Sequence, residues 1–172
     1  MDDVTSLVLI PMVADFVRIP IIAGGGIADA RGFLAALALG AEGVVMGTRF
    51  VATLECPAHP RIKEGFIKAR ETDTMIIQRS IRNVARVIKN KAAEKTFSME
   101  QRGASLEELL TVISGQMGQK ALQEGDLEGA IIACGQCVGL IHEIKSVKEV
   151  IEEIVQGAQS ILQKLNALVR SQ

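Results

Sequence analysis

Two stretches decide the fold of this chain: Ile21-Ile22-Ala23-Gly24-Gly25-Gly26-Ile27 and Gly43-Val44-Val45-Met46-Gly47-Thr48. Each is a short apolar run that stops at glycine, as expected for parallel strands covered on both faces. Between them, residues 29–39 are rich in alanine and leucine and predict a helix. Asp29 is placed to cap this helix, and Gly40 is placed to end it in the left-handed conformation. The pattern predicts a strand–helix–strand unit of an α/β fold.

The two glycine loops are candidates for a phosphate site. Glycine allows positive φ and a close approach of the backbone to a ligand, and exposed N–H groups there attract anions. Loops of this kind after strands seven and eight hold phosphate in many (β/α)8 barrels. Thr48 would then donate its hydroxyl and N–H to a phosphate oxygen. Alternatively, Thr48 only caps the turn into Arg49 and Phe50.

The composition excludes several classes of function. The chain has 172 residues, 48% of them apolar, which suits a globular domain with a core. A net charge of −1 favours neither nucleic acid nor an anionic membrane, and five Phe without Trp or Tyr leave few stacking platforms. The start lacks a basic region, so no signal peptide is expected. No uncharged run approaches the ~20 residues of a membrane span. The three cysteines predict a reduced, cytoplasmic setting.

The rest of the chain is mostly helical in pattern. Residues 6–10 are expected to be extended, with a helix opening near Pro11. The other expected elements are a helix over 61–70, a possible strand over 75–77, a helix to about 113 after a capping box at Ser105 and Glu108, a helix over 116–123 stopped at Gly125, and a long one-faced helix after a second capping box at Ser146 and Glu149.

The sequence resembles a known family. The residues that carry the resemblance are 20–29 and 41–50, then Arg82-Asn83 and 135–141, with the closing helix. They are similar to the nitronate monooxygenases, formerly called 2-nitropropane dioxygenases, and to the related flavin-dependent enoyl-acyl-carrier-protein reductases. Many phosphate-binding barrels share the glycine loops, so the combination with Gly47-Thr48-Arg49-Phe50 and the late Gly-Gln-x-x-Gly-Leu-Ile is the more specific signal.

The resemblance implies a cofactor and its contacts. Family members are FMN-binding TIM barrels that oxidise nitronates with O2 or, in the sister group, reduce enoyl thioesters. Carried over to this chain, the cofactor-binding residues are Gly24, Gly25, Gly26, Val45, Met46, Gly47 and Thr48. The family's catalytic base is a histidine in a Gly-Gly-His stretch just upstream of where residue 1 aligns. No catalytic residue and no metal ligand are therefore expected within the chain.

The resemblance also implies a division of the chain. Residues 1–56 would be the last two βα units of a TIM barrel, 57–133 an inserted small α+β domain, mainly helical, and 134–172 the return to the barrel with a long C-terminal helix. A complete barrel takes roughly 250 residues. The two barrel strands alone leave unpaired edges, which invite self-association or a complementing N-terminal half. The alternative is an inactive fragment that serves only as an assembly subunit.

Five further side chains are candidates for site residues. His59 could act as a base near neutral pH, but a surface or turn role is favoured; His142 is expected on a helix after Gly139 in a structural role. Cys134 and Cys137 form a CxxC that could be a redox dithiol, although small buried residues are the favoured interpretation. Gln136 either faces the flavin or substrate pocket or caps a helix.

The basic residues between Arg79 and Arg102 are the last feature. They could bind an acidic partner or carrier protein, but a solvated face is the favoured interpretation.

Overall fold

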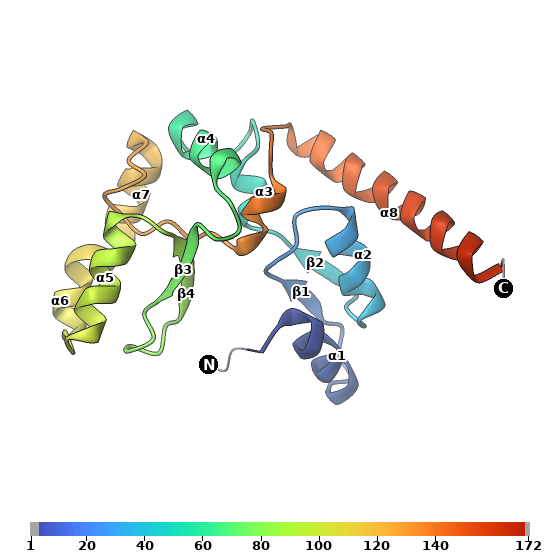
Figure 1. The fold of residues 1–172 in the computed structure, drawn as a ribbon, viewed down its shortest axis with the longest axis horizontal. Helices are drawn as coiled ribbons and strands as arrows, with labels where there is room; N and C mark the ends of the chain where they lie inside the picture. Colours follow the sequence, from blue (N-terminus) through green and yellow to red (C-terminus); the bar gives the residue numbers. More distant parts are fainter. Residues whose placement is uncertain (1–3, 171–172) are drawn as a thin grey trace.

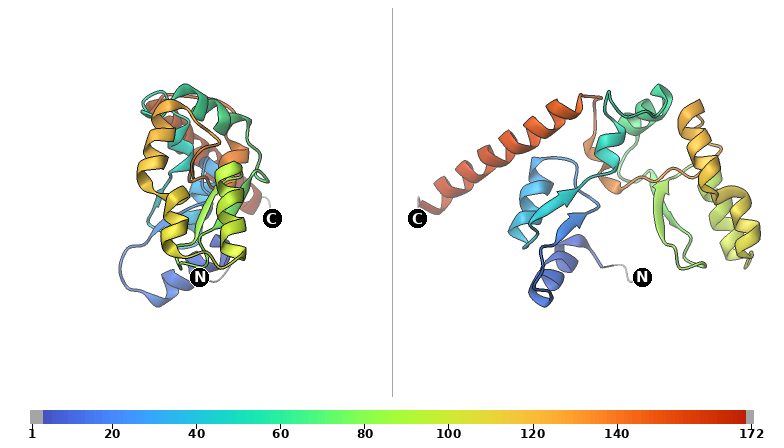
Figure 2. Two further views of the ribbon diagram at one scale, coloured as in Figure 1. Left: turned by 90° about the vertical axis from the view of Figure 1, so that its left-hand side faces the viewer. Right: turned by 180° about the vertical axis from the view of Figure 1, so that it is seen from behind.

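The computed structural model describes residues 4–170 as a mixed α/β fold with two small sheets (Figures 1 and 2). The elements in order are α1 (Ser6–Phe16), β1 (Ile22–Gly24), α2 (Ala30–Ala38), β2 (Gly43–Val45), α3 (Thr48–Val51), α4 (Pro60–Lys68), β3 (Thr74–Ile77), β4 (Ala85–Ile88), α5 (Lys91–Gln101), α6 (Leu106–Ile113), α7 (Gly115–Glu124), the 3-10 helix η1 (Gln136–Leu140) and α8 (Val147–Arg170). None of the helices in these described residues is both long and apolar enough to cross a bilayer.

The predicted strand–helix–strand unit is confirmed. β1 and β2 pair in parallel, with Ile22 opposite Gly43, and α2 connects them. The Asp29 carboxylate accepts hydrogen bonds from the N–H groups of Arg31 and Gly32 at 2.9 and 3.1 Å, which satisfies donors that a helix start leaves free. Gly40 has φ +99° just after the helix, as expected for a glycine that ends it.

The second sheet lies at the other end of the molecule. β3 and β4 pair antiparallel, with Thr74 opposite Ile88, and α5, α6 and α7 gather beside them (Figure 1). Ile77, Val87 and Ala93 are fully buried in the core between this sheet and α5. The Ser105–Glu108 capping box that opens α6 is present as predicted, and Gly125 ends α7 in the left-handed conformation.

A central core joins the two ends. Phe66 and Ile62 of α4 pack with Ile88 of β4, with Ile132 and with Val138 of η1. This cluster contains residues from both sides of the predicted boundary near 133. The division of the chain at 56 and 133 stays a prediction.

Helix α8 is only partly packed. Its predicted capping box is present, because the Glu149 N–H donates to the Ser146 Oγ at 3.2 Å and the Ser146 N–H donates to the Glu149 carboxylate at 2.8 Å. The first half lies on α2, where a Cβ on Gly157 would stand 2.6 Å from the Cβ of Ala30. The second half projects from the body (Figures 1 and 2), and Leu162 and Leu165 remain about half exposed.

Two expectations for individual segments were wrong. Helix α1 begins at Ser6, so Pro11 lies inside it. Proline cannot donate the hydrogen bond to the residue four positions back, but the first turn forms before it and is closed by the Leu9 N–H on the Thr5 carbonyl at 2.9 Å. His142 is not helical, since η1 ends at Leu140. The chain there must extend to bring Lys145 into its bridge with Thr53.

The cap of α2 gives a pH-dependent prediction. Burial opposes ionisation of Asp29, but hydrogen bonds from the Arg31 side chain and the Gly32 N–H outweigh it and lower the pKa of the carboxyl. A folded pKa below the unfolded one means that this stabilisation is complete above the unfolded pKa and is lost as the pH falls through the folded value. Asp29→Ala should therefore reduce the free energy of unfolding by about 1 kcal/mol at neutral pH, and the difference from the parent chain should shrink in acid.

Urea unfolding at a series of pH values measures that difference. Asp15→Ala is the matched control, because Asp15 is an exposed residue of α1 and its loss should change the stability little at any pH. A deficit for Asp29→Ala that stayed constant from neutral to acid pH would contradict the role assigned to the ionised carboxylate.

Candidate functional site

A cavity of about 370 Å3 lies where the two glycine loops face the segment that leads into η1. Its lining comes from the loop after β1, the loop after β2, strand β4 and the CxxC segment. The lining residues are Gly25, Gly26, Ile27, Met46, Gly47, Thr48, Val51, Arg86, Ala133, Cys134, Gly135 and Cys137. Tertiary structure thus brings five of the seven predicted cofactor-binding residues to a single cavity: Gly25, Gly26, Met46, Gly47 and Thr48.

The glycines leave open space in front of the backbone. Gly25 and Gly26 have φ +88° and +77°, a region that other residues rarely adopt. A Cβ built on Gly25, Gly26 or Gly47 would meet no atom within 4 Å, so the cavity side of both loops is free for a ligand. The residues present therefore fit a phosphate group held against the main chain.

Gly24 and Val45 occupy a different place. A Cβ on Gly24 would stand 2.8 Å from the Val45 Cγ1, so Gly24 allows β1 and β2 to pack closely. Neither residue is among those that line the cavity, and Val45 is 61% exposed. These two positions support the loops from the strands behind them.

The hydroxyl of Thr48 is engaged by the protein. Its Oγ1 accepts a hydrogen bond from the Gly135 N–H at 2.9 Å, and its side chain also hydrogen-bonds the Cys137 thiol. Thr48 therefore ties the loop after β2 to the segment on the opposite wall of the cavity. This contact spans 87 positions of sequence, and sequence reasoning did not anticipate it.

The two cysteines of the CxxC line the cavity as buried thiols. Burial, and next to it the neighbouring Cys137, raises the pKa of Cys134 to about 12. Burial also raises the pKa of Cys137, against the hydrogen bond from Thr48. A reactive dithiol needs a lowered pKa, so these thiols behave as small buried side chains. Gln136 between them is exposed at the start of η1 and does not line the cavity.

His59 lies outside this cavity and begins a helix. Its Nδ1 accepts a hydrogen bond from the Arg61 N–H at 3.1 Å, as the N-cap of α4. The expected structural role therefore has a definite form. Among residues 4–170, no group of three histidine, cysteine or acidic side chains is placed to hold a metal ion.

Arg86 is the residue that sequence reasoning missed. It is the one charged side chain among the described residues that line the cavity. The signal was weak: Arg86 interrupts the apolar residues 85–88, but strand β4 was not predicted, so the residue was counted only as part of the basic stretch.

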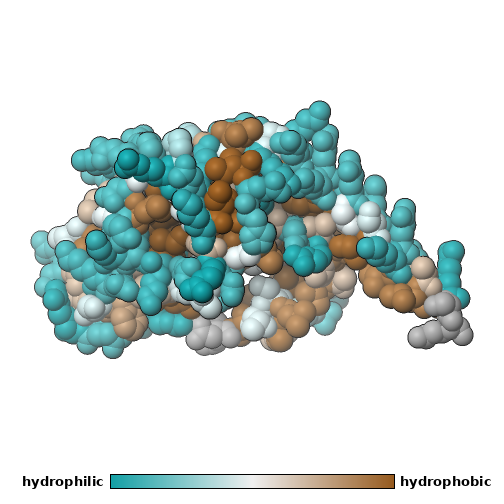
Figure 3. Space-filling view, turned by 45° about the horizontal axis from the view of Figure 1, so that its top comes forward, coloured by the Kyte–Doolittle hydropathy of each residue, from teal (hydrophilic) through white to brown (hydrophobic). Residues whose placement is uncertain are grey.

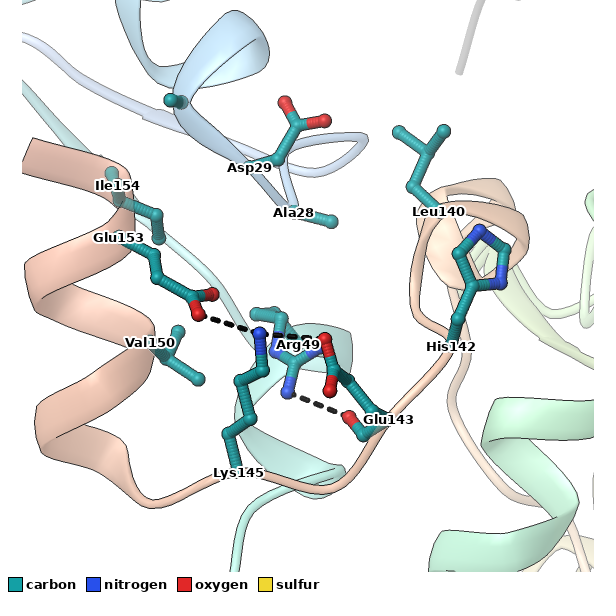
Figure 4. A pocket seen from close by; sticks show the side chains of 11 residues that line it. Ala28, Asp29, Arg49, Leu140, His142, Glu143, Lys145, Val150, Glu153 and Ile154 are labelled. Atoms are coloured by element: carbon teal, nitrogen blue, oxygen red, sulfur yellow. Dashed lines mark hydrogen bonds and ion pairs between the residues drawn. The ribbon is translucent and has the colours of Figure 1, made fainter. Parts of the chain in front are cut away.

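A second cavity of about 220 Å3 is lined by Arg49 of α3, by Val150, Glu153 and Ile154 of α8, and by the segment that contains His142 (Figure 4). The Nζ of Lys145 bridges the carboxylates of Glu143 and Glu153 at 2.6 and 2.5 Å. The buried Arg49 donates from Nη2 to the carbonyls of Ala52 and Glu143 at 2.9 and 3.1 Å, and its Nε has no partner. Burial lowers the pKa of Arg49, and Glu153 and Glu143 oppose that effect. Two positive and two negative charges are thus paired, and the cluster connects α3 to α8 through residues 143–145.

Comparison with known proteins gives matches to a family model, to curated relatives and to solved structures. The model of the family described as nitronate monooxygenase matches residues 1–157. A probable nitronate monooxygenase from Staphylococcus aureus strain Newman is 41% identical over 97 residues, which are 56% of this chain and 27% of that protein. The chain thus spans about a quarter of the length of the curated relatives it matches.

The solved structures that resemble the chain cover nearly all of it. The structure of FabK from Thermotoga maritima matches with a TM-score of 0.90 and 42% identity, over 98% of this chain and 53% of FabK. A nitroalkane oxidase from Streptomyces ansochromogenes matches with a TM-score of 0.73 over 92% of this chain and 45% of its own. At 23% identity, the second match shows a shared fold alone.

Proposed function

Since the chain belongs to the nitronate monooxygenase family, we propose that it supplies the FMN-phosphate-binding half of a flavin-dependent oxidoreductase. One observation carries this proposal: the two glycine loops line a common cavity, and a Cβ on Gly25, Gly26 or Gly47 would meet no protein atom within 4 Å. The family resemblance supports FMN as the ligand. Gly25, Gly26 and Gly47 would hold the phosphate through main-chain N–H groups, with Met46 beside them.

The proposed reaction combines the chemistry of the cofactor with the binding roles of this chain's residues. FMN, when bound, supplies the redox chemistry, and the proposed overall reaction is oxidation of an alkyl nitronate with O2. The residues of this chain bind and orient the cofactor: the loops fix the phosphate, and Thr48 holds the opposite wall in place through Gly135. The base of the family, a histidine upstream of the aligned region, would come from outside these residues.

Exposed apolar side chains on β1, β2 and α1 support the proposal that further barrel units cover this surface. Parallel strands are normally covered on both faces, yet Ile22 of β1 and Val45 of β2 are each 61% exposed, and Phe16 of α1 is 88% exposed. Apolar patches also interrupt the polar surface and continue along α8 (Figure 3). The chain matches only 53% of the FabK chain. We therefore propose that β1, β2 and their helices are the last two βα units of a TIM barrel. The preceding units would cover this surface.

The proposal is tested by FMN titration with flavin fluorescence and molecular mass measured together. The chain is titrated alone and after co-expression with a polypeptide that carries the preceding βα units of the family. We expect a one-to-one complex of the two polypeptides that binds FMN tightly and oxidises nitronates. Enoyl thioester reduction in place of nitronate oxidation would assign the chain to the reductase branch of the resemblance. A complex without FMN binding would overturn the proposed function.

A further inference from the structure

Arg86 is held in a fixed position on the cavity wall. Its backbone lies in β4, opposite Ile76 of β3, and its carbonyl accepts a hydrogen bond from the Cys134 N–H at 3.1 Å. The next residue, Val87, bridges to Ala133. The main chain of Arg86 is therefore anchored on both sides, between β3 and the segment that leads into η1.

The guanidinium of Arg86 has unused hydrogen-bond donors. Its Nη1 donates to the Thr74 Oγ1 at 3.1 Å, and within residues 4–170 this is its one side-chain partner. No carboxylate in that part of the chain forms an ion pair with it. A guanidinium carries several N–H donors in a planar fork that matches phosphate oxygens. The Thr74 contact fixes one arm of this fork and leaves the other donors for a ligand.

The charge on the described residues that line the cavity is positive. No aspartate or glutamate is among the described lining residues, and the remaining side chains there are apolar, glycine, threonine or cysteine. Burial raises the pKa of both cysteines, so they add no negative charge at neutral pH. The guanidinium and the glycine loops consequently favour an anionic ligand in the same space.

We propose that Arg86 binds the phosphate of the flavin cofactor, as the cationic partner of the main-chain N–H groups of the two glycine loops. This inference rests on the proposed function for the identity of the ligand. It adds a side chain from the second sheet to a site that the sequence assigned to the loops alone. It also gives β3 and β4 a role, since they carry a positive charge to the cofactor.

The test compares FMN with riboflavin, which lacks the phosphate. Arg86→Gln should weaken FMN binding about ten- to a hundredfold, the loss expected for charge-assisted hydrogen bonds, and should leave riboflavin binding unchanged. Arg86→Lys keeps the positive charge but loses the planar fork of donors, so its FMN affinity should lie between those of the parent chain and Arg86→Gln. Arg61→Gln is the matched control, because Arg61 is an exposed residue of α4 outside the cavity.

A second measurement needs no substitution. Inorganic phosphate is added to the FMN-free complex of the isotope-labelled chain with the preceding barrel units, and NMR follows the Arg86 Nε–H signal together with the amides of Gly25, Gly26 and Gly47. Joint shifts of the loop amides and Arg86 support the inference. Shifts of the loop amides alone, with unchanged FMN affinity in Arg86→Gln, overturn it and leave the proposed function standing. Equal losses for FMN and riboflavin overturn it as well, and no shift at either place overturns both proposals.

Discussion

Gly47→Val is expected to weaken FMN binding by at least about a hundredfold, as the loss of two charge-assisted hydrogen bonds would, while the chain still folds. Gly47 has φ −92° and ψ −64°, which any residue can adopt, and a Cβ there meets no atom within 4 Å. The valine side chain would therefore enter free space in the cavity and take the volume assigned to the phosphate. Fluorescence titration of the FMN-binding assembly measures the change.

A matched control separates this steric effect from the general effect of valine in place of glycine. Gly115 also lacks a positive φ and has open space at its Cβ position, but it begins α7, away from the cavity. Gly115→Val should leave FMN affinity unchanged. Unchanged affinity in Gly47→Val would sink the assignment of the loop after β2 to the phosphate.

Phe66→Ala is expected to lower the free energy of unfolding by about 3–5 kcal/mol, the usual cost of truncating a buried phenylalanine. Phe66 is completely buried and packs with Ile88, Ile132 and Cys134. The substitution would therefore leave a new void where α4, β4 and the CxxC segment meet. A loss of this size is a large part of the ~5–15 kcal/mol by which domains are stable. Urea denaturation followed by circular dichroism measures it.

Phe16→Ala provides the comparison for Phe66. Phe16 is 88% exposed at the end of α1, so the same substitution should change the stability of the isolated chain by less than about 0.5 kcal/mol. It should instead weaken association with the preceding barrel units, which are proposed to cover that surface. Equal destabilisation by the two substitutions would show that burial of Phe66 in the central core does not contribute the stability assigned to it.

Local signals predicted the elements that local physics forms. The strands around the first glycine loop, the cap at Asp29 and the stop at Gly40 all appear in the structure, and so do both capping boxes. For the caps and the helix stop, the residues that make the contact lie within a few positions of one another. Propensity and capping act over that range, so the sequence contains the whole of the argument.

The elements that were missed depend on distant partners. Strand β4 carries an arginine and no clear alternation, and it forms because it pairs with β3 and receives the Cys134 N–H. His142 follows a pattern that suggested a helix, but the connection to α8 must extend toward Thr53. Pairing and burial outweighed local preference at both places, as is usual for short apolar runs.

The sequence by itself determined the two glycine loops, the helix between them and the family to which the chain belongs. Only the tertiary structure decided what faces those loops: the Thr48–Gly135 hydrogen bond across 87 positions, the buried thiols and the guanidinium of Arg86. The physical reason is that a turn or cap is a contact between neighbours in the chain. A cavity instead exists only after packing has brought remote segments together, and its charge and shape follow from that packing.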